Sequence, residues 1–170
     1  MGQYCKKYFK TIKLMLGGFH KMRVSKLLSV RKSKSTIIRK IVGKLLLKKG
    51  LDLPYSVELG NNVSFPHNGL GTVIHNSTII HDNVKIYQNV TLGRKDIWIE
   101  HKTIPGIEIM DDAIICAGAK VLAGDEKLTI GKGAIVAANA VLFNSIGENE
   151  IWGGIPARFL GYRKDIKKED

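Results

Sequence analysis

Cysteine is nearly absent from this 170-residue chain. Cys5 and Cys116 are its only two cysteines, and they lie in different regions of the sequence. They therefore form neither a framework of paired cysteines nor the closely spaced cluster that a zinc site needs. Because disulfides accumulate in oxidising compartments, their scarcity favours a protein of the reducing cytoplasm.

Long hydrophobic runs are also missing. A bilayer-spanning helix needs roughly 20 consecutive apolar residues, whereas the longest candidates, IKLMLGGF and IVGKLLLKKG, are interrupted or bounded by lysine. No apolar stretch precedes a small-residue cleavage site, so we expect no secretory signal. The sequence therefore predicts a soluble protein.

Acidic residues are absent from residues 1–50, which hold 15 of the 27 Lys and Arg residues. The first acid is Asp52, and the remaining 120 residues carry 12 basic and 15 acidic side chains, a formal net charge of −3. The chain's overall charge of +12 thus belongs to one segment. Since no recognition-helix, RNA-binding or finger motif accompanies this charge, we expect no nucleic-acid partner.

The basic segment, residues 1–50, mixes its lysines and arginines with aliphatic residues at nearly helical spacing. This pattern predicts two short amphipathic helices, the second over about Thr36 to Lys49. Their apolar face could pack on the body or on a neighbouring subunit while the lysines face water. Alternatively, the helices could lie on an anionic membrane surface or hold an acidic polymer.

From Leu53 onward, aliphatic residues recur every six positions. The thirteen anchors are Leu53, Leu59, Phe65, Ile74, Ile80, Ile86, Leu92, Ile109, Ile115, Val121, Ile130, Val136 and Leu142. Small or β-branched residues such as Val84 and Ala119 follow most anchors by four positions. A hexapeptide period is typical of a parallel β-helix, in which anchors point inward and Gly, Asn and Asp form the turns. Three hexads make a coil of 18 residues, so the period predicts that residues 18 apart stack, in about four coils.

Four motifs carry a resemblance to a known family. They are PHNGLGTVIH at 66–75, VKIYQNVTLG at 84–93, CAGAKVLAG at 116–124 and GGIPARFLG at 153–161. Over about Leu51 to Gly161 the chain resembles the hexapeptide-repeat acyltransferases, in the serine acetyltransferase-like branch, and the bacterial polysaccharide O-acetyltransferases. The resemblance implies an all-β, left-handed parallel β-helix over residues 51–161, an exception to the right-handed crossover rule. It also implies a homotrimer with active sites between subunits. Residues 162–170 are expected to form a charged tail.

His67 lies where the hexapeptide rhythm is interrupted, because the step from Phe65 to Ile74 is nine residues instead of six. The resemblance assigns His67 as the general base that removes a proton from an acceptor hydroxyl, a task suited to a side chain with a pKa near 6.5. It also matches Asp52, fifteen residues earlier, to the aspartate that orients this imidazole. The alternative is that His67 is a polar loop residue.

The co-substrate implied by the resemblance is acetyl-CoA. Ala117 and Ala138 match positions whose backbone groups bond the pantetheine arm, and Lys120 and Arg158 are candidates for the CoA phosphates. The alternative for both charges is a solvated position. Cys116 is interpreted as a small turn residue. No histidine pair is 18 residues apart, which argues against a zinc-dependent hexapeptide carbonic anhydrase, and we expect no metal.

Two features depart from serine acetyltransferases. The chain has a short basic segment in place of a long acidic helical domain, and Gly106 and Ile107 stand where those enzymes carry a His-Pro dipeptide. Between Gly93 and Ile109 a loop places Arg94, Trp98 and His101 where they could contact a sugar, since loops on a rigid scaffold commonly determine specificity. Trp98 could equally pack against a neighbouring chain.

These observations predict an acetyl-CoA-dependent O-acetyltransferase that acts on a sugar hydroxyl of a bacterial surface glycan, such as capsule or lipopolysaccharide. The expected location is the cytoplasm, with peripheral contact at the inner face of the membrane through residues 1–50. The alternatives are a serine O-acetyltransferase of cysteine biosynthesis and a non-catalytic hexapeptide scaffold.

Overall fold

The structure, a computed structural model, describes residues 22–100 and 105–164. His101, Cys5, the first part of the predicted basic segment and the end of the predicted tail lie outside the described residues. Within the described part of the chain, no helix is both long and apolar enough to cross a bilayer.

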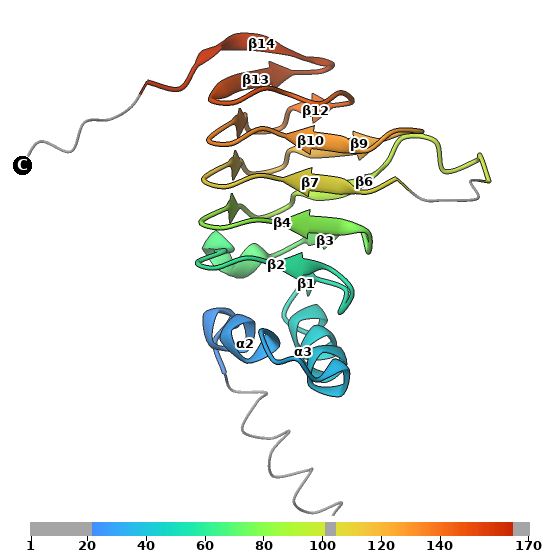
Figure 1. The fold of residues 1–170 in the computed structure, drawn as a ribbon, viewed down its shortest axis with the longest axis vertical. Coiled ribbons are helices and arrows are strands. Elements are labelled where there is room, and N and C mark those ends of the chain that lie inside the picture. Colours follow the sequence, from blue (N-terminus) through green and yellow to red (C-terminus); the bar gives the residue numbers. More distant parts are fainter. Residues whose placement is uncertain (1–21, 101–104, 165–170) are drawn as a thin grey trace, which may run out of the picture.

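Short strands stack into three sheets, parallel except for the last strand, which form the faces of a prism (Figure 1). Face A consists of β1 (Leu51–Asp52), β3 (Thr72–Ile74), β6 (Thr91–Arg94), β9 (Lys120–Ala123) and β12 (Val141–Leu142). Face B consists of β2 (Glu58–Leu59), β4 (Thr78–Ile80), β7 (Ile107–Ile109) and β10 (Leu128–Ile130). Face C consists of β5 (Lys85–Ile86), β8 (Ile114–Ile115), β11 (Ile135–Val136), β13 (Glu150–Gly154) and β14 (Ala157–Tyr162). The chain visits the faces in order, so the predicted parallel β-helix is confirmed.

The core consists of the predicted anchors. All thirteen anchors except Leu59, which is half-buried, are buried inside the prism. The small residues four positions later, such as Ala113, Ala119 and Ala134, are fully buried. Alanine suits these sites because the chain turns a corner there and leaves little volume for a side chain.

The coils are longer than predicted. Along face A the paired residues are Leu51 and Thr72, Val73 and Thr91, Thr91 and Lys120, and Lys120 and Val141. Their separations are 21, 18, 29 and 21 residues, so the prediction that residues 18 apart stack is correct for one step only. The reason is that each interruption adds its residues to the coil that contains it, while the strands on both sides keep their pairing.

Two helices close the N-terminal end of the prism. They are α2 (Val24–Arg31) and α3 (Thr36–Leu47), which lie beneath β1 and β2 (Figure 1). The predicted second helix is confirmed, although it ends two residues earlier. Leu27 and Leu46 are fully buried in the same core as the prism. The described part of the basic segment therefore packs on the body, and burying each such leucine contributes about 1.5 to 3 kcal/mol.

The C-terminal end is closed by a hairpin. β14 pairs antiparallel with β13, and Arg163 then donates its backbone N–H to the carbonyl of Asn149 at 2.6 Å. The paired strand therefore continues through Tyr162, which is the first residue of the predicted tail.

Candidate active site at one corner of the prism

His67 lies at the corner where the chain passes from face C to face A, which we call the C–A corner. It belongs to a short 3-10 turn, Pro66–Gly69, between the Ser64 bridge to β5 and strand β3. His67 and Asn68 both adopt a positive φ, 54° and 61°. This conformation is uncommon for residues other than glycine and is characteristic of tight turns and functional sites. The interruption seen in the sequence therefore turns the His67 side chain out of the wall of the prism.

The His67 side chain is exposed, and its nearest aromatic neighbour is Tyr87 on the next coil. The two ring centroids are 6.4 Å apart, with an interplanar angle of 45°. Tyr87 was missed by the sequence analysis, although its position directly after anchor Ile86 places it at the same corner. The imidazole is thus open to solvent on one side and next to a phenol on the other.

Above His67, successive coils place Gln88, Ala117 and Ala138 at the first position of the corner turn. Their carbonyls join the coils, since Gly118 donates to Gln88 at 3.0 Å and Asn139 donates to Ala117 at 2.9 Å. The backbone N–H groups of Gln88, Ala117 and Ala138 have no acceptor among the described residues. The corner therefore presents three N–H donors in a column, next to the small side chains of Ala117 and Ala138.

The next corner, where the chain passes from face B to face C, is built differently. Here the same turn position is occupied by Asn61, Asp82 and Asp111 on successive coils. The Asp82 carboxylate accepts the Asn61 N–H at 2.6 Å, and the Asp111 carboxylate accepts the Asp82 N–H at 2.9 Å. At this B–C corner the turn donors of Asn61 and Asp82 are thus each satisfied by a carboxylate from the coil above, whereas Lys132 stands above Asp111.

Gly118 and Asn139 occupy the second turn position of the C–A corner, where φ is positive at 74° and 56°. A Cβ on Gly118 would stand 2.1 Å from Oδ1 of Asn139. Gly71 and Asn89 form the same arrangement below, with a corresponding distance of 2.2 Å. Each asparagine amide therefore packs directly against the Cα of a glycine. A side chain at the glycine position would not fit, so no side chain projects from the corner there.

Lys120 and Arg158 are the two residues predicted to bind the CoA phosphates. Lys120 lies at this corner, and Arg158 lies on β14 at the C-terminal end of the prism. The Lys120 ammonium donates to the carbonyl of Asn89 at 2.8 Å, so it is held at the C–A corner. Arg158 is exposed on β14, and its Nη1 donates a hydrogen bond to the adjacent carbonyl of Ala157 at 3.2 Å. A phosphate role for either residue stays a prediction.

Asp52 belongs to face A, next to the N-terminal helices. It is half-buried on β1, in a groove of about 320 Å³ with Lys40, Leu47 and Tyr55 of the helical end and the adjoining loop. Among the described residues its carboxylate makes no hydrogen bond to His67. The structure thus shows no hydrogen bond between the two side chains within the single chain, and the role of Asp52 stays a prediction.

Arg94 and Trp98 lie at the third corner, where the chain passes from face A to face B. Arg94 pairs with the buried carboxylate of Asp96, with its Nη2 2.6 Å and its Nε 2.9 Å from Oδ1. Trp98 is 78% exposed in the segment that projects from the prism after β6 (Figure 1). These predicted acceptor-binding residues and His67 thus occupy different corners of one chain. Asp96 was not predicted, although its position two residues after Arg94 was a usable signal.

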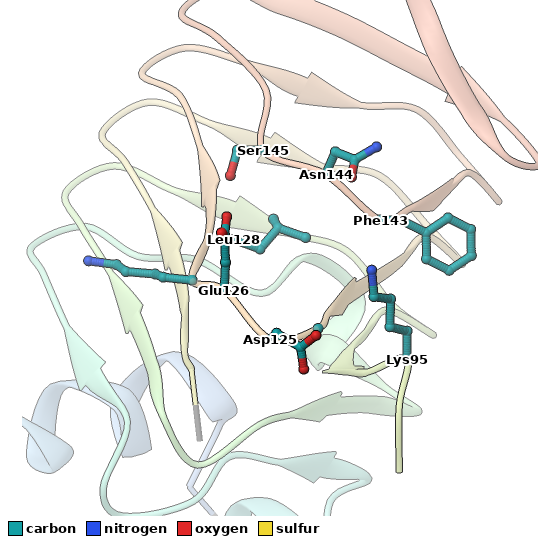
Figure 2. Close-up of a pocket in the computed structure, with 9 residues that line it drawn as sticks. Lys95, Asp125, Glu126, Leu128, Phe143, Asn144 and Ser145 are labelled. Carbon is teal, nitrogen blue, oxygen red and sulfur yellow. The ribbon is translucent and has the colours of Figure 1, made fainter. Parts of the chain in front are cut away.

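The A–B corner also holds a recess of about 270 Å³ (Figure 2). It is lined by Lys95, the loop that includes Asp125 and Glu126, and Phe143 and Ser145 from the turn after β12. A Cβ on Gly124 would stand 2.3 Å from Cε of Lys95, so that lysine lies directly on the loop backbone. Because both charge signs line it, the recess shows no electrostatic preference for one class of ligand.

The other side chains that could take part in chemistry are Cys116, His81 and His75, and we assign none of them a catalytic role. Burial raises the pKa of the Cys116 thiol, so the thiol is protonated at neutral pH and is a poor nucleophile. His81 bonds Glu108 at 2.9 Å on face B. Burial, with a smaller effect of the Arg94 charge, lowers the pKa of His75. Among the described residues, no three His, Cys, Asp or Glu side chains come together as a metal site.

Several known proteins that resemble this chain in sequence and in structure are serine acetyltransferases. The serine acetyltransferase of Bacillus licheniformis is 30% identical over 128 residues, which covers 71% of this chain and 55% of that protein. A soybean serine acetyltransferase structure superimposes with a TM-score of 0.63 at 26% identity, covering 85% of this chain and 56% of that one. A serine acetyltransferase in complex with CoA gives 0.59 at 25% identity, covering 85% and 55%. The chain is a hexapeptide-repeat protein of the serine acetyltransferase type.

This hexapeptide-repeat protein therefore has the left-handed β-helix of its structural neighbours, as predicted. It spans about half the length of the curated serine acetyltransferases that it matches. No family model matches the chain. A relative of another name, UDP-3-O-acylglucosamine N-acyltransferase of a Caulobacter strain, is 31% identical over 120 residues, which covers 70% of this chain and 33% of that protein.

Proposed function

We propose that this protein is an acetyl-CoA-dependent O-acetyltransferase that acetylates the hydroxyl of L-serine, with His67 as the general base. The observation that carries the proposal is the column of N–H donors from Ala138 to Gln88, which have no acceptor in residues 22–100 and 105–164 and which end next to Tyr87, the aromatic neighbour of His67. Relatives named serine acetyltransferase, including one solved with CoA, support this acceptor and co-substrate.

The residues of the corner fit an extended acyl-CoA. The pantetheine arm of CoA carries amide carbonyls, which can accept from the N–H groups of Ala117 and Ala138, and the small side chains leave room for a slender ligand. Lys120, held at the same corner, supplies a positive charge. Acetyl-CoA would supply the thioester, whose carbonyl carbon is the electrophile.

The chemistry of His67 follows from its exposure. Its neutral ring nitrogen accepts the proton of the serine hydroxyl as the oxygen attacks the thioester carbonyl. When the carbon–sulfur bond breaks, the imidazolium returns this proton to the departing sulfur. The products are the acetyl ester and CoA thiol. In this scheme Asp52 would orient the imidazole after a shift of side chains or from a neighbouring chain.

The acceptor test measures release of CoA thiol from acetyl-CoA. We expect turnover with L-serine, and a loss of about 10² to 10⁴ in rate when His67 is replaced by alanine. His81→Ala is the matched control, since His81 lies on face B and should leave the rate unchanged. Equal rates in wild type and His67→Ala would exclude His67 as the base, and absence of turnover with every hydroxyl tested would favour a scaffold.

A sugar hydroxyl is the second candidate acceptor, as the sequence analysis first proposed. It is favoured by Gly106, which stands where serine acetyltransferases carry the histidine of their His-Pro dipeptide. A Cβ on Gly106 would lie 2.1 Å from the carbonyl oxygen of Ser77, so this position accepts no side chain. Including UDP-N-acetylglucosamine and an acidic bacterial polysaccharide in the thiol-release assay decides between the acceptors.

We also propose a homotrimer. Arg94 and Trp98 lie at the A–B corner, and His67 lies at the C–A corner, so the exposed loop of one chain can approach His67 only from a neighbouring copy. Light scattering of the purified protein should give three times the chain mass of 18.8 kDa. A monomer that retains full activity would contradict this arrangement.

Peripheral contact with an anionic membrane is proposed for the outer face of α3. Ile37 and Leu47 are 71% and 56% exposed there, and Lys40 and Lys44 lie between them. Apolar and cationic side chains on one helix face suit an anionic bilayer surface. Deleting residues 1–50 would also remove buried core, so the sharper test is retention of Ile37→Ser and Leu47→Ser on phosphatidylglycerol vesicles. Equal retention of variant and wild type would exclude the contact.

A further inference from the structure

The turn between α2 and α3 forms a strongly cationic recess against β2. Its volume is about 250 Å³, and its lining includes Arg31, Lys32, Lys34 and Arg39, with Glu58 as the only acid of the lining. The recess is at the N-terminal end of the prism and is separate from the C–A corner, so the proposed acetyl transfer makes no use of it.

Two guanidinium groups in this recess converge on one carbonyl oxygen. Arg31 donates Nη1 and Nη2 to the Val57 carbonyl, both at 3.2 Å, and Arg39 donates Nη2 to the same oxygen at 2.9 Å. Arg31 also donates to the carbonyl of Pro54. A carbonyl oxygen carries only a partial negative charge, so two full positive charges meet there without neutralisation.

Carboxylates do not balance these charges. Arg31 is only 3% exposed, and its Nε has no partner among the described residues. Glu58 is exposed and forms no ion pair with Arg31 or Arg39 in the part of the chain that the structure describes.

Arg94, whose side chain is 12% exposed, shows what is missing at Arg31. Arg94 is paired with the buried Asp96 carboxylate through two nitrogens, at 2.6 and 2.9 Å. Buried charges are normally paired in this way, because an isolated ion loses its hydration without compensation. At Arg31 the pKa is lowered to about 10, first by burial and then by the charge of Arg39.

We propose that the recess is a binding site for an oxyanion of the phosphate class, which supplies the negative charge that Arg31 and Arg39 lack. Arg39, Lys32 and Lys34 are its accessible contacts, and the planar guanidinium of Arg39 matches the geometry of phosphate oxygens. Arg31 is buried and holds the Val57 carbonyl in place by hydrogen bonds. Its positive charge adds to the electrostatic attraction for the anion without direct contact. The phosphate group is either a free ion or the headgroup of an anionic lipid, and the chemistry of recognition is the same.

The test is thermal unfolding of the full chain in increasing inorganic phosphate, with sodium chloride adjusted to hold ionic strength constant. Wild type should show a saturable rise in melting temperature, because a ligand that binds the folded state stabilises it. Arg39→Gln should weaken the apparent phosphate affinity at least about ten-fold, since a charge-assisted hydrogen bond is lost. Lys34→Gln should weaken it less.

Lys132→Gln is the matched control, because Lys132 is an exposed lysine on a turn of the B–C corner and should respond as wild type. Arg31 is left intact because its removal would unfold the helical end. No saturable response in wild type, or an Arg39→Gln response equal to wild type, would overturn the site, provided that vesicle binding also shows no dependence on Arg39.

The vesicle arm identifies the source of the phosphate. Vesicles of phosphatidylcholine with phosphatidic acid are compared with phosphatidylcholine alone, for wild type and Arg39→Gln. Binding of phosphatidic acid vesicles that needs Arg39, without a response to inorganic phosphate, supports the site with a lipid headgroup as its ligand. A response to both supports a site for the phosphate group itself. Vesicle binding that is equal in Arg39→Gln, with no phosphate response, overturns the proposal.

Discussion

The C–A and B–C corners of the prism have the same backbone turn but different side chains. At the B–C corner, Asp82 and Asp111 accept the turn N–H groups of the coil below. At the C–A corner, Ala117 and Ala138 occupy the equivalent positions, and the donors have no acceptor among the described residues. Two turn donors of the B–C corner are thus satisfied by that corner's own carboxylates, whereas the three donors of the C–A corner are left to water or a ligand. The difference shows how one repeating fold can use its turn N–H groups for stability at one corner and leave them available to bind a ligand at another.

Ala138→Asp would give the C–A corner the construction of the B–C corner. The new carboxylate should accept the Ala117 N–H, as Asp111 accepts the N–H of Asp82. It also places a negative charge where the proposal puts an anionic co-substrate. We expect the KM for acetyl-CoA to rise at least about ten-fold, with little change in stability. Lys132→Asp makes the same change at the B–C corner, so a KM increase there too would contradict the comparison.

Gly118→Ala tests the narrowness of the C–A corner. The φ of 74° is unfavourable for alanine, and its Cβ would stand 2.1 Å from Asn139 Oδ1. We expect a loss of about 1 to 3 kcal/mol in the free energy of unfolding, measured with urea. Gly93→Ala, whose Cβ would have its nearest neighbours at 3.6 Å, should be nearly neutral. Similar losses in both variants would show that the corner is not specifically constrained.

Asp111→Ala opens the B–C corner. It removes the 2.9 Å bond to the Asp82 N–H, so the free energy of unfolding should fall by about 1 kcal/mol. The acetyl-CoA KM should stay at the wild-type value, because this corner has no proposed part in binding. A change in KM with no change in stability would reverse the roles that we assign to the two corners.

Acidification should weaken the B–C corner through Asp82. Hydrogen bonds from the backbone of Asn61, and then from its side chain, lower the pKa of this carboxyl. A carboxyl whose pKa is lower in the folded state stabilises the protein above its unfolded pKa of 3.8, and this stabilisation is lost as pH falls through the folded value. Asp82→Asn should therefore show a flatter decline of stability below about pH 4. Parallel curves for variant and wild type would contradict the assignment.

The core was predictable because it is periodic. Anchors such as Ile74 and Val136 are spaced by the geometry of a coil, and their burial follows from that spacing alone. The turn that exposes His67 was also predictable, since it breaks the same period. Coil length was not, because residues inserted between Gly93 and Ile109 leave the pairing of the flanking strands intact.

The parts of the site that the sequence did not predict depend on neighbours from other coils. The unpaired N–H of Ala117 is a property of Ala138 one coil above, and no local pattern contains both. The distance between Asp52 and His67 depends on the face that each occupies. Arg31 looked like one more basic residue of a charged segment, yet it is buried against the carbonyls of Pro54 and Val57.

The covers at the two ends of the prism prevent one molecule from associating end to end with another. The strands of every inner coil form backbone hydrogen bonds with the coil above and the coil below. An uncovered terminal coil would leave one row of backbone N–H and C=O groups unpaired, and another chain could pair with it. The helices α2 and α3 cover one edge, and the antiparallel return of β14 covers the other. Mutations that loosen either cover, such as polar substitutions of Leu27 or Leu46, should convert discrete particles into end-to-end fibres.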